Sequence, residues 1–186
     1  MEARKTDTWK LKKWFNVYEP KVLGEEVIAE IPADSDKSIV GRNLEINLSW
    51  LTKKPEHSFM SATLRIIGAE GDSAQTELTR LEQSYSYTHS LARRYSSVIH
   101  TVDKVKDKNG KEFIVKLIAV TRDRVATTKK TAIRKMLSSF VRNYVAASSY
   151  DDFIKSVIEE KFQGESASQI KRIAPIKSVN VRKVEF

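Results

Sequence analysis

The side chains best able to do chemistry in this sequence are lysines and arginines crowded into residues 121–145. Seven of them stand against the single carboxylate of Asp123, so the stretch contributes a net +6 to a chain whose formal net charge is +9. They are Arg122, Arg124, Lys129, Lys130, Arg134, Lys135 and Arg142. Such cations can be no more than the solvated back of a helix. A dense excess without acidic partners one turn away favours the other interpretation, a surface that binds a polyanion.

Helical periodicity in the same stretch predicts how these cations are positioned. Apolar residues recur there at steps of three and four, which is typical of a helix with one buried face. They are Ile133, Met136, Leu137, Phe140, Val141, Tyr144 and Val145. At about 100° per residue, the opposite face holds Arg134, Lys135, Ser138 and Arg142. The sequence therefore predicts an amphipathic helix that packs on a core and presents cations outward.

A buried strand is expected just before that helix. Residues 107–110 contain Asn109-Gly110, the strongest short-range signal for a hairpin. The return strand, residues 113–120, is apolar at nearly every position except Lys116, which predicts burial on both faces. Arg122 and Arg124 then follow the end of a buried strand, so we expect them on a built surface rather than on a loose tail.

The N-terminal half is expected to be mostly β. Strand patterns cover residues 14–19, 27–31, 59–67, 75–81 and 98–102, and residues 33–38 are expected to form a loop. Alternation of Leu44, Ile46, Leu48 and Trp50 with polar residues predicts one more half-buried strand. Thr88 is expected to cap a short helix that carries Arg93 and Arg94.

Two short helices and a strand are expected after the basic helix. Ser149 and Asp152 resemble a capping box, and Gly164 is expected to end the helix that they start. Ser166 is expected to start the next helix, which Pro175 terminates. In the last strand the apolar alternation changes phase at Arg182-Lys183, which predicts a β-bulge that turns both cations outward.

Residues 1–13 differ in character from the rest of the chain. They are polar and mostly basic, with Lys10, Lys12 and Lys13 close to the aromatic Trp14. We expect residues 1–13 to be an arm that becomes ordered only on RNA, and residues 14–186 to be a single RNA-binding α+β domain. Trp14 has two interpretations, a core aromatic beside a strand or a platform for base stacking.

Composition limits the class of protein. The chain has 186 residues, 40% of them hydrophobic, which suits one domain with a real core. It has no cysteine, so disulfides and thiolate metal sites are excluded. The N-terminus has no apolar secretory segment, and no apolar run reaches the roughly 18 residues of a membrane span. The expectation is a soluble, intracellular, basic domain with no membrane partner.

Catalytic motifs are missing from the sequence. His57, His89 and His100 lie in separate segments without metal-ligand spacing, and no phosphate-binding glycine loop or serine nucleophile motif occurs. The paired carboxylates look like surface or helix-terminal charge rather than an acid/base pair. We therefore expect no enzyme activity, no cofactor, no metal and no small-molecule substrate. A metal-dependent nuclease built from scattered carboxylates is the alternative.

Several stretches, taken in order, resemble the archaeal and eukaryotic small-subunit ribosomal protein family called S-three-a-e. They are Lys13-Trp14-Phe15-x-Val17-x-x-Pro20, Gly41-Arg42-x-x-Glu45-x-x-Leu48, residues 99–110 with the return strand, the Ile133-Arg134-Lys135-Met136 helix, and the block 170–186. The likeness covers the chain from about residue 10 onward. Two departures are that Tyr95 stands where eukaryotic members often have Trp, and that the long eukaryotic tail is missing, as in the shorter archaeal form.

The resemblance implies an α+β fold with an antiparallel β-barrel-like core, flanking helices and a basic N-terminal arm. It also implies a structural, non-catalytic place on the platform of the small ribosomal subunit, in the cytoplasm, near the rRNA 3′ end and neighbouring ribosomal proteins. The residues expected to touch RNA are Lys10, Lys12, Lys13, Trp14, Arg42, Arg93, Arg94, Arg122, Arg124, Lys129, Lys130, Arg134, Lys135, Arg142, Arg182 and Lys183. The alternative is a free-standing RNA-binding module, such as an RNA chaperone or a translational regulator.

Overall fold

The computed structural model describes residue 9 and residues 12–20, 23–24 and 26–186. The strands are β1 (Lys13–Tyr18), β2 (Val27–Ala33), β3 (Asn43–Asn47), β4 (Met60–Glu70), β5 (Ser73–Gln83), β6 (Val98–Lys106), β7 (Glu112–Thr121) and β8 (Ile176–Glu185). The helices are α1 (Asp36–Ile39), α2 (Leu48–Thr52), α3 (Tyr85–Ser90), α4 (Thr127–Ala147), α5 (Tyr150–Ile158) and α6 (Lys161–Ile170), with a 3-10 turn, η2 (Pro55–Phe59), before β4. The predicted α+β class is confirmed.

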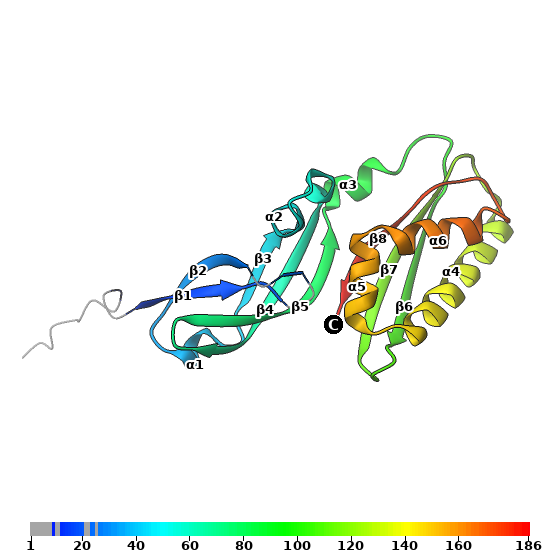
Figure 1. Ribbon diagram of the computed structural model, residues 1–186. Helices are drawn as coiled ribbons and strands as arrows, with labels where there is room; N and C mark the ends of the chain where they lie inside the picture. The colour runs from blue at the N-terminus through cyan, green and yellow to red at the C-terminus, as the bar shows by residue number, and fades with distance from the viewer. Residues whose placement is uncertain (1–8, 10–11, 21–22, 25) are drawn as a thin grey trace, which may run out of the picture.

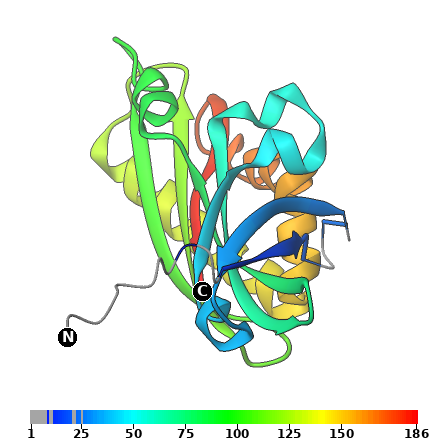
Figure 2. The same ribbon diagram turned by 90° about the vertical axis from the view of Figure 1, so that its left-hand side faces the viewer.

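All eight strands belong to one branched sheet (Figure 1). Its main path runs β2-β1-β5-β8-β7-β6, while β4 pairs with the other edge of β5 and β3 lies beyond β4. Only the short β1–β5 pairing is parallel. The outer strands β2, β3 and β6 do not pair with one another within the described part of the chain, so the sheet is not closed (Figure 2). The expected barrel-like core is thus an open antiparallel sheet.

Two hydrophobic cores stabilise the sheet. Helices α4, α5 and α6 lie on one face of β6, β7 and β8 (Figure 1), and the large core between them includes Leu117, Leu137, Phe153 and Phe162, each at most 1% exposed. A smaller core, which includes Phe15, lies among β1, β2, α1, β4 and β5. Each fully buried side chain of this size stabilises the fold by roughly 1.5–3 kcal/mol.

Strand β7 is buried on both faces, as predicted. Leu117 and Ala119 point into the large core, whereas Ile118 and Val120 alternate with them and point to the opposite face. Both of these side chains are at most 1% exposed. The hairpin before β7 also follows the prediction, with Gly110 at φ 83°, where only glycine is unstrained.

The prediction of a strand that continues through Trp50 is wrong beyond β3, because helix α2 follows. The side chain of Asn47 accepts a hydrogen bond from the backbone N–H of Ser49 at 3.0 Å and so caps helix α2. Helical spacing then buries Leu48 and Leu51 together and leaves Trp50 exposed. An alternating pattern of four apolar residues suits either structure until the cap is recognised.

Three helix boundaries also differ from the expectations. Helix α3 is capped by Ser84 rather than Thr88, and the chain over Arg93 and Arg94 is a turn rather than a helix. Helix α5 starts after Ser149 as predicted but ends at Ile158, because Glu160 adopts a left-handed conformation with φ 58°. Gly164 and Ser166 therefore lie inside α6, where an interior glycine costs about 1 kcal/mol relative to alanine.

Candidate nucleic-acid interface

Hydrogen bonds to neighbouring chain segments hold the loop that joins β7 to α4 in place. Thr121 is fully buried, and its hydroxyl accepts a hydrogen bond from the Ser97 N–H at 3.0 Å. The Arg122 N–H donates to the Pro175 carbonyl at 2.9 Å. The side chains of Arg122 and Arg124 are nevertheless exposed. They belong to a fixed surface, as the sequence predicts, and the structure shows that three separate chain segments assemble it.

An aromatic contact joins this loop to the turn before β6. The Arg124 guanidinium lies 5.9 Å from the centre of the Tyr95 ring, within the range of a cation–π contact. Tyr95 has φ 68° and is mostly exposed, and Arg93 and Arg94 are exposed in the same turn. The structure thus brings together two basic segments that lie about thirty residues apart in sequence.

Helix α4 presents its cations from a firmly buried base. Ile133, Leu137, Val141 and Val145 are all 0% exposed. The exposed cations of the helix are Lys129, Arg134, Lys135 and Arg142, while Lys130 is half-buried. Within the described residues, no carboxylate lies at ion-pair distance from any of these except Arg142. Most of the positive charge on this face is therefore uncompensated.

Arg142 differs from its neighbours because it faces a buried carboxylate. Asp103 on β6 is 3% exposed, accepts a hydrogen bond from the Ser138 hydroxyl at 2.9 Å, and lies 3.4 Å from an Arg142 nitrogen. Ser138 was expected on the outer face of the helix, and it is instead turned toward the sheet. Arg142 therefore helps to compensate Asp103 as well as facing solvent.

The sheet carries a second basic surface on the face opposite α4, α5 and α6 (Figure 1). Burial alternates along β6, so His100, Val102 and Lys104 are exposed on that face, with Lys116 on β7 half-buried among them. Burial lowers the pKa of His100, and the charges of Arg182 and Arg134 lower it further. The positive field of α4 therefore extends around the edge strand β6 to the open face. Sequence reasoning missed Lys104 and Lys116, although the alternation of residues 98–106 was a usable signal.

Two expected contact residues are engaged within the protein. The bulge in β8 forms as predicted, with Lys183 opposite Lys116 and Val181 opposite Leu117. Lys183 is not turned outward, however: its side chain is 15% exposed and its amine pairs with Glu185 at 3.1 Å and Glu82 at 3.5 Å. That part of the prediction is wrong, because β5 places a carboxylate beside the bulge.

Arg42 is likewise bound to its own domain. Its Nε donates to the Ser38 carbonyl at 2.9 Å, and an Nη donates to the Pro32 carbonyl at 3.1 Å. The guanidinium is exposed at its edge, but two of its five N–H groups hold the loop around α1. This arrangement indicates a mainly structural residue.

The N-terminal cations lie far from α4. Lys13 and Trp14 are exposed at the start of β1, and the Lys12 amine lies 4.6 Å from the centre of the Trp9 ring. Trp14 is 57% exposed, so it is not a core residue. Figure 1 shows this strand and α4 at opposite ends of the molecule. Lys10, and the expected arm over most of residues 1–13, lie outside the described residues.

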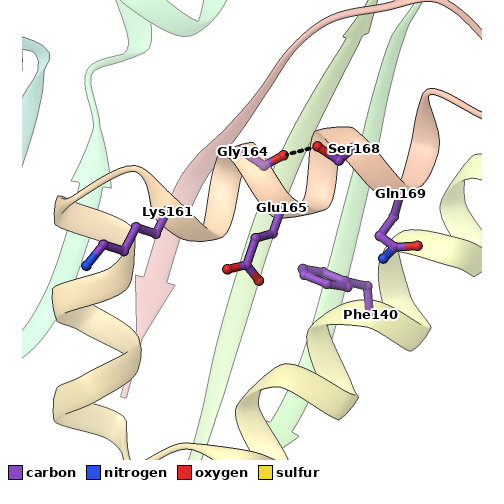
Figure 3. A pocket seen from close by; sticks show the side chains of 6 residues that line it. All are labelled: Phe140, Lys161, Gly164, Glu165, Ser168 and Gln169. Atoms are coloured by element: carbon purple, nitrogen blue, oxygen red, sulfur yellow. Dashed lines mark hydrogen bonds between the residues drawn. The ribbon is translucent and has the colours of Figure 1, made fainter.

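A shallow cavity of about 460 Å³ lies between α4 and α6 (Figure 3). The Phe140 ring on α4 faces Glu165 and Gln169 on α6, and the Ser168 hydroxyl donates to the Gly164 carbonyl at 2.9 Å. The cavity is a packing irregularity around one aromatic ring. Among the described residues no group of three or more His, Asp or Glu is placed to hold a metal ion.

These features define a class: a basic α+β protein whose cations stand on a preformed surface at one end of an open sheet. The whole chain, residues 1–186, matches the model of the Ribosomal S3Ae family, and the chain belongs to that family. The family consists of structural ribosomal proteins, so the expectation of a non-enzymatic protein is confirmed. No described helix is both long and apolar enough to cross a membrane.

Archaeal relatives match the chain over nearly all of its length. A protein of Pyrobaculum calidifontis is 36% identical over 181 residues, which are 97% of this chain and 82% of the relative. One of Sulfurisphaera tokodaii is 34% identical over 97% of this chain and 93% of its own length. One of Archaeoglobus fulgidus is 31% identical over 99% of this chain and 88% of its own length. Each is named small ribosomal subunit protein eS1.

Proposed function

We propose that this protein is a structural constituent of the small ribosomal subunit and that it binds rRNA through one continuous basic surface. This surface, the α4 surface, consists of Arg93, Arg94, Arg122, Arg124, Lys129, Arg134 and Lys135. The observation that carries the proposal is that these cations are exposed and without described acidic partners, while the elements beneath them are fixed by a buried helix face and by backbone hydrogen bonds. The names of the relatives support the ribosomal part.

The α4 surface is suited to phosphates rather than to bases. Arginine and lysine on a rigid base bind phosphate oxygens without first losing the freedom of a loop. Such contacts fix a protein on folded RNA while reading little of its sequence. The open face around His100 and Lys104 extends the same positive field, and Lys13 with Trp14 offers a separate, smaller contact at the other end.

The finer location follows the family resemblance. We place the protein on the platform of the small subunit, near the rRNA 3′ end and beside other ribosomal proteins, in the cytoplasm. A structural role of this kind needs tight, stoichiometric binding rather than turnover.

Sedimentation tests this proposal. A lysate of the source cells is resolved on a sucrose gradient before and after a high-salt wash, and the protein is followed by immunoblot. We expect it to co-migrate with small subunits at one copy per subunit. A low-mass peak free of subunits would contradict the ribosomal role and support the alternative, a free-standing RNA-binding module.

A further inference from the structure

The edge of β5 that faces β1 and β8 lacks strand pairing in its middle. The strand pairs with β1 at Ser73 and Ala74 and with β8 at Arg80–Glu82, and residues 75–79 have no registered partner on that side within the described chain. The carbonyls of Leu78 and Thr79 accept hydrogen bonds from the Tyr150 hydroxyl and the Phe186 N–H, respectively. Backbone groups alternate between the two edges of a strand, and the carbonyls of Asp72 and Leu78 face this side, so within residues 75–77 the backbone of Thr76 does so. The Thr76 hydroxyl donates to the Tyr18 carbonyl at 2.7 Å. An unpaired strand edge is a template for an added extended peptide.

A cavity of about 600 Å³ opens over this interruption. We call it the β5 groove. Its apolar wall includes Tyr18, Pro20, Leu78 and Tyr150, which come from the end of β1, from β5 and from the start of α5. Leu78 and Tyr150 are held in the large core, at 2% and 5% exposure. The groove thus has rigid apolar walls beside available backbone groups, which is the usual form of a peptide site.

The charge of the β5 groove is opposite to that of the molecule. Among the described residues, three carboxylates line it, those of Glu19, Glu77 and Asp151, against one amine, that of Lys111. Lys111 is already paired with Glu77 at 3.0 Å. Burial and then the charge of Glu26 raise the pKa of Glu19, so an added cation would favour its ionised form. On a chain of net charge +9, a groove of this sign repels RNA and attracts cations.

We propose that the β5 groove binds an extended basic peptide segment of a partner protein. Lysine or arginine side chains of the segment would face Glu77 and Asp151, and its apolar side chains would lie against Tyr18 and Tyr150. Its backbone would pair with Thr76 of β5. This site is separate from the α4 surface, so the protein would contact RNA at one end and a protein neighbour at the sheet interruption.

Fluorescence anisotropy with a labelled nine-residue peptide of alternating lysine and valine tests the proposal, using the full chain. The charge-removing variant is Glu77→Gln/Asp151→Asn, and Gln75→Lys adds a cation at the open edge. We expect each to weaken peptide binding by about three- to tenfold, because each removes attraction or adds repulsion at a partly exposed site. The matched control, Glu45→Gln/Glu56→Gln, removes the same charge from exposed positions outside the groove. It should change binding by less than about twofold.

Any one of the following results would overturn the proposal. One is equal weakening in the control, which would mean that only net charge matters. Another is equal binding of a glutamate–valine peptide, or competition by a single-stranded RNA. The third is a concentration-dependent dimer that the peptide dissociates, which would make a second copy the occupant. Amide NMR shifts on peptide addition should be centred on residues 75–77, and shifts centred elsewhere would also reject the site. RNA binding by the Glu77→Gln/Asp151→Asn variant should be undiminished, so failure here is distinguishable from failure of the rRNA role.

Discussion

The two ends of the molecule carry similar cations in different circumstances (Figure 1). At the end formed by α4, Arg124, Arg134 and Lys135 are exposed and without described acidic partners. At the end formed by β1, β2 and α1, Arg42 donates to two backbone carbonyls, and Lys53 beyond them pairs with Glu26 at 2.7 Å. The comparison teaches that residue type gives the sign of a surface, whereas the neighbours decide whether the charge is available to a ligand.

The difference has a structural cause. Helix α4 buries one continuous stripe, so most of its cations, Arg142 excepted, point away from the protein. The short α1 and its flanking loops bury little, and their turns need hydrogen-bond donors from side chains. Cations near such loops are therefore used internally.

Leu137→Ala should weaken the packing that holds α4, and with it the α4 surface, on the sheet. The side chain is 0% exposed in the large core, so its truncation should lower the free energy of unfolding by about 2–5 kcal/mol. Urea unfolding followed by circular dichroism measures this. The exposed Ser139→Ala on the same helix should stay within about 0.5 kcal/mol of the parent protein. A loss below about 1 kcal/mol for Leu137→Ala would show that α4 is not packed as described.

His100 should report RNA at the edge of β6. Because burial and nearby cations lower its pKa in the folded protein, its contribution to stability is complete above the unfolded value near 6.5 and is lost as the pH falls. RNA phosphates beside it should raise its pKa, so RNA should bind more tightly as the pH falls through this range. NMR titration of the imidazole with and without an rRNA fragment measures the change. An unchanged pKa would place RNA away from this edge.

Deletion of residues 1–12 should have a smaller effect, on binding alone. It removes Arg4, Lys5, Lys10 and Lys12 but none of the residues in either core. The thermal midpoint should stay unchanged while rRNA fragments bind more weakly. A large drop in the midpoint would show that the arm packs on the domain.

A chelator should have no effect. The described residues hold no cluster suited to a metal ion, so EDTA should leave unfolding and RNA binding unchanged once the magnesium needed by the RNA is supplied in both arms. RNA cleavage that requires a divalent metal and is lost on Asp or Glu substitution would instead support the nuclease alternative.

Much of the fold follows from local patterns. Periodicity predicts α4, and the Asn109-Gly110 turn predicts the β6–β7 hairpin, because both depend on residues close in sequence. The sequence analysis missed the ends of β3 and α5, because each end depends on the conformation of one residue. Asn47 caps α2, and Glu160 adopts a left-handed conformation. Their alternatives fit the pattern equally well.

The site is only partly predictable, because its decisive contacts span long sequence distances. The sequence contains the cations of α4, but it does not show that Arg142 meets Asp103 or that Lys183 meets Glu82. The β5 groove combines five segments from Tyr18 to Asp151, and no local motif marks it. Residue types predict which chemical groups the protein carries, whereas tertiary contacts decide which of those groups remain available to a ligand.

The central claim is most directly tested by the salt dependence of rRNA binding. In Arg124→Gln/Arg134→Gln/Lys135→Gln, the slope of log affinity against log salt should flatten by about two to three units, since each phosphate contact contributes about 0.7–0.9. The control is Lys53→Gln/Lys106→Gln/Lys161→Gln, which removes the same charge from lysines already paired with Glu26, Glu112 and Glu159. Its slope should stay within about half a unit of the parent protein. Equal slopes for the two triple variants would contradict the α4 surface as the place where this protein holds RNA.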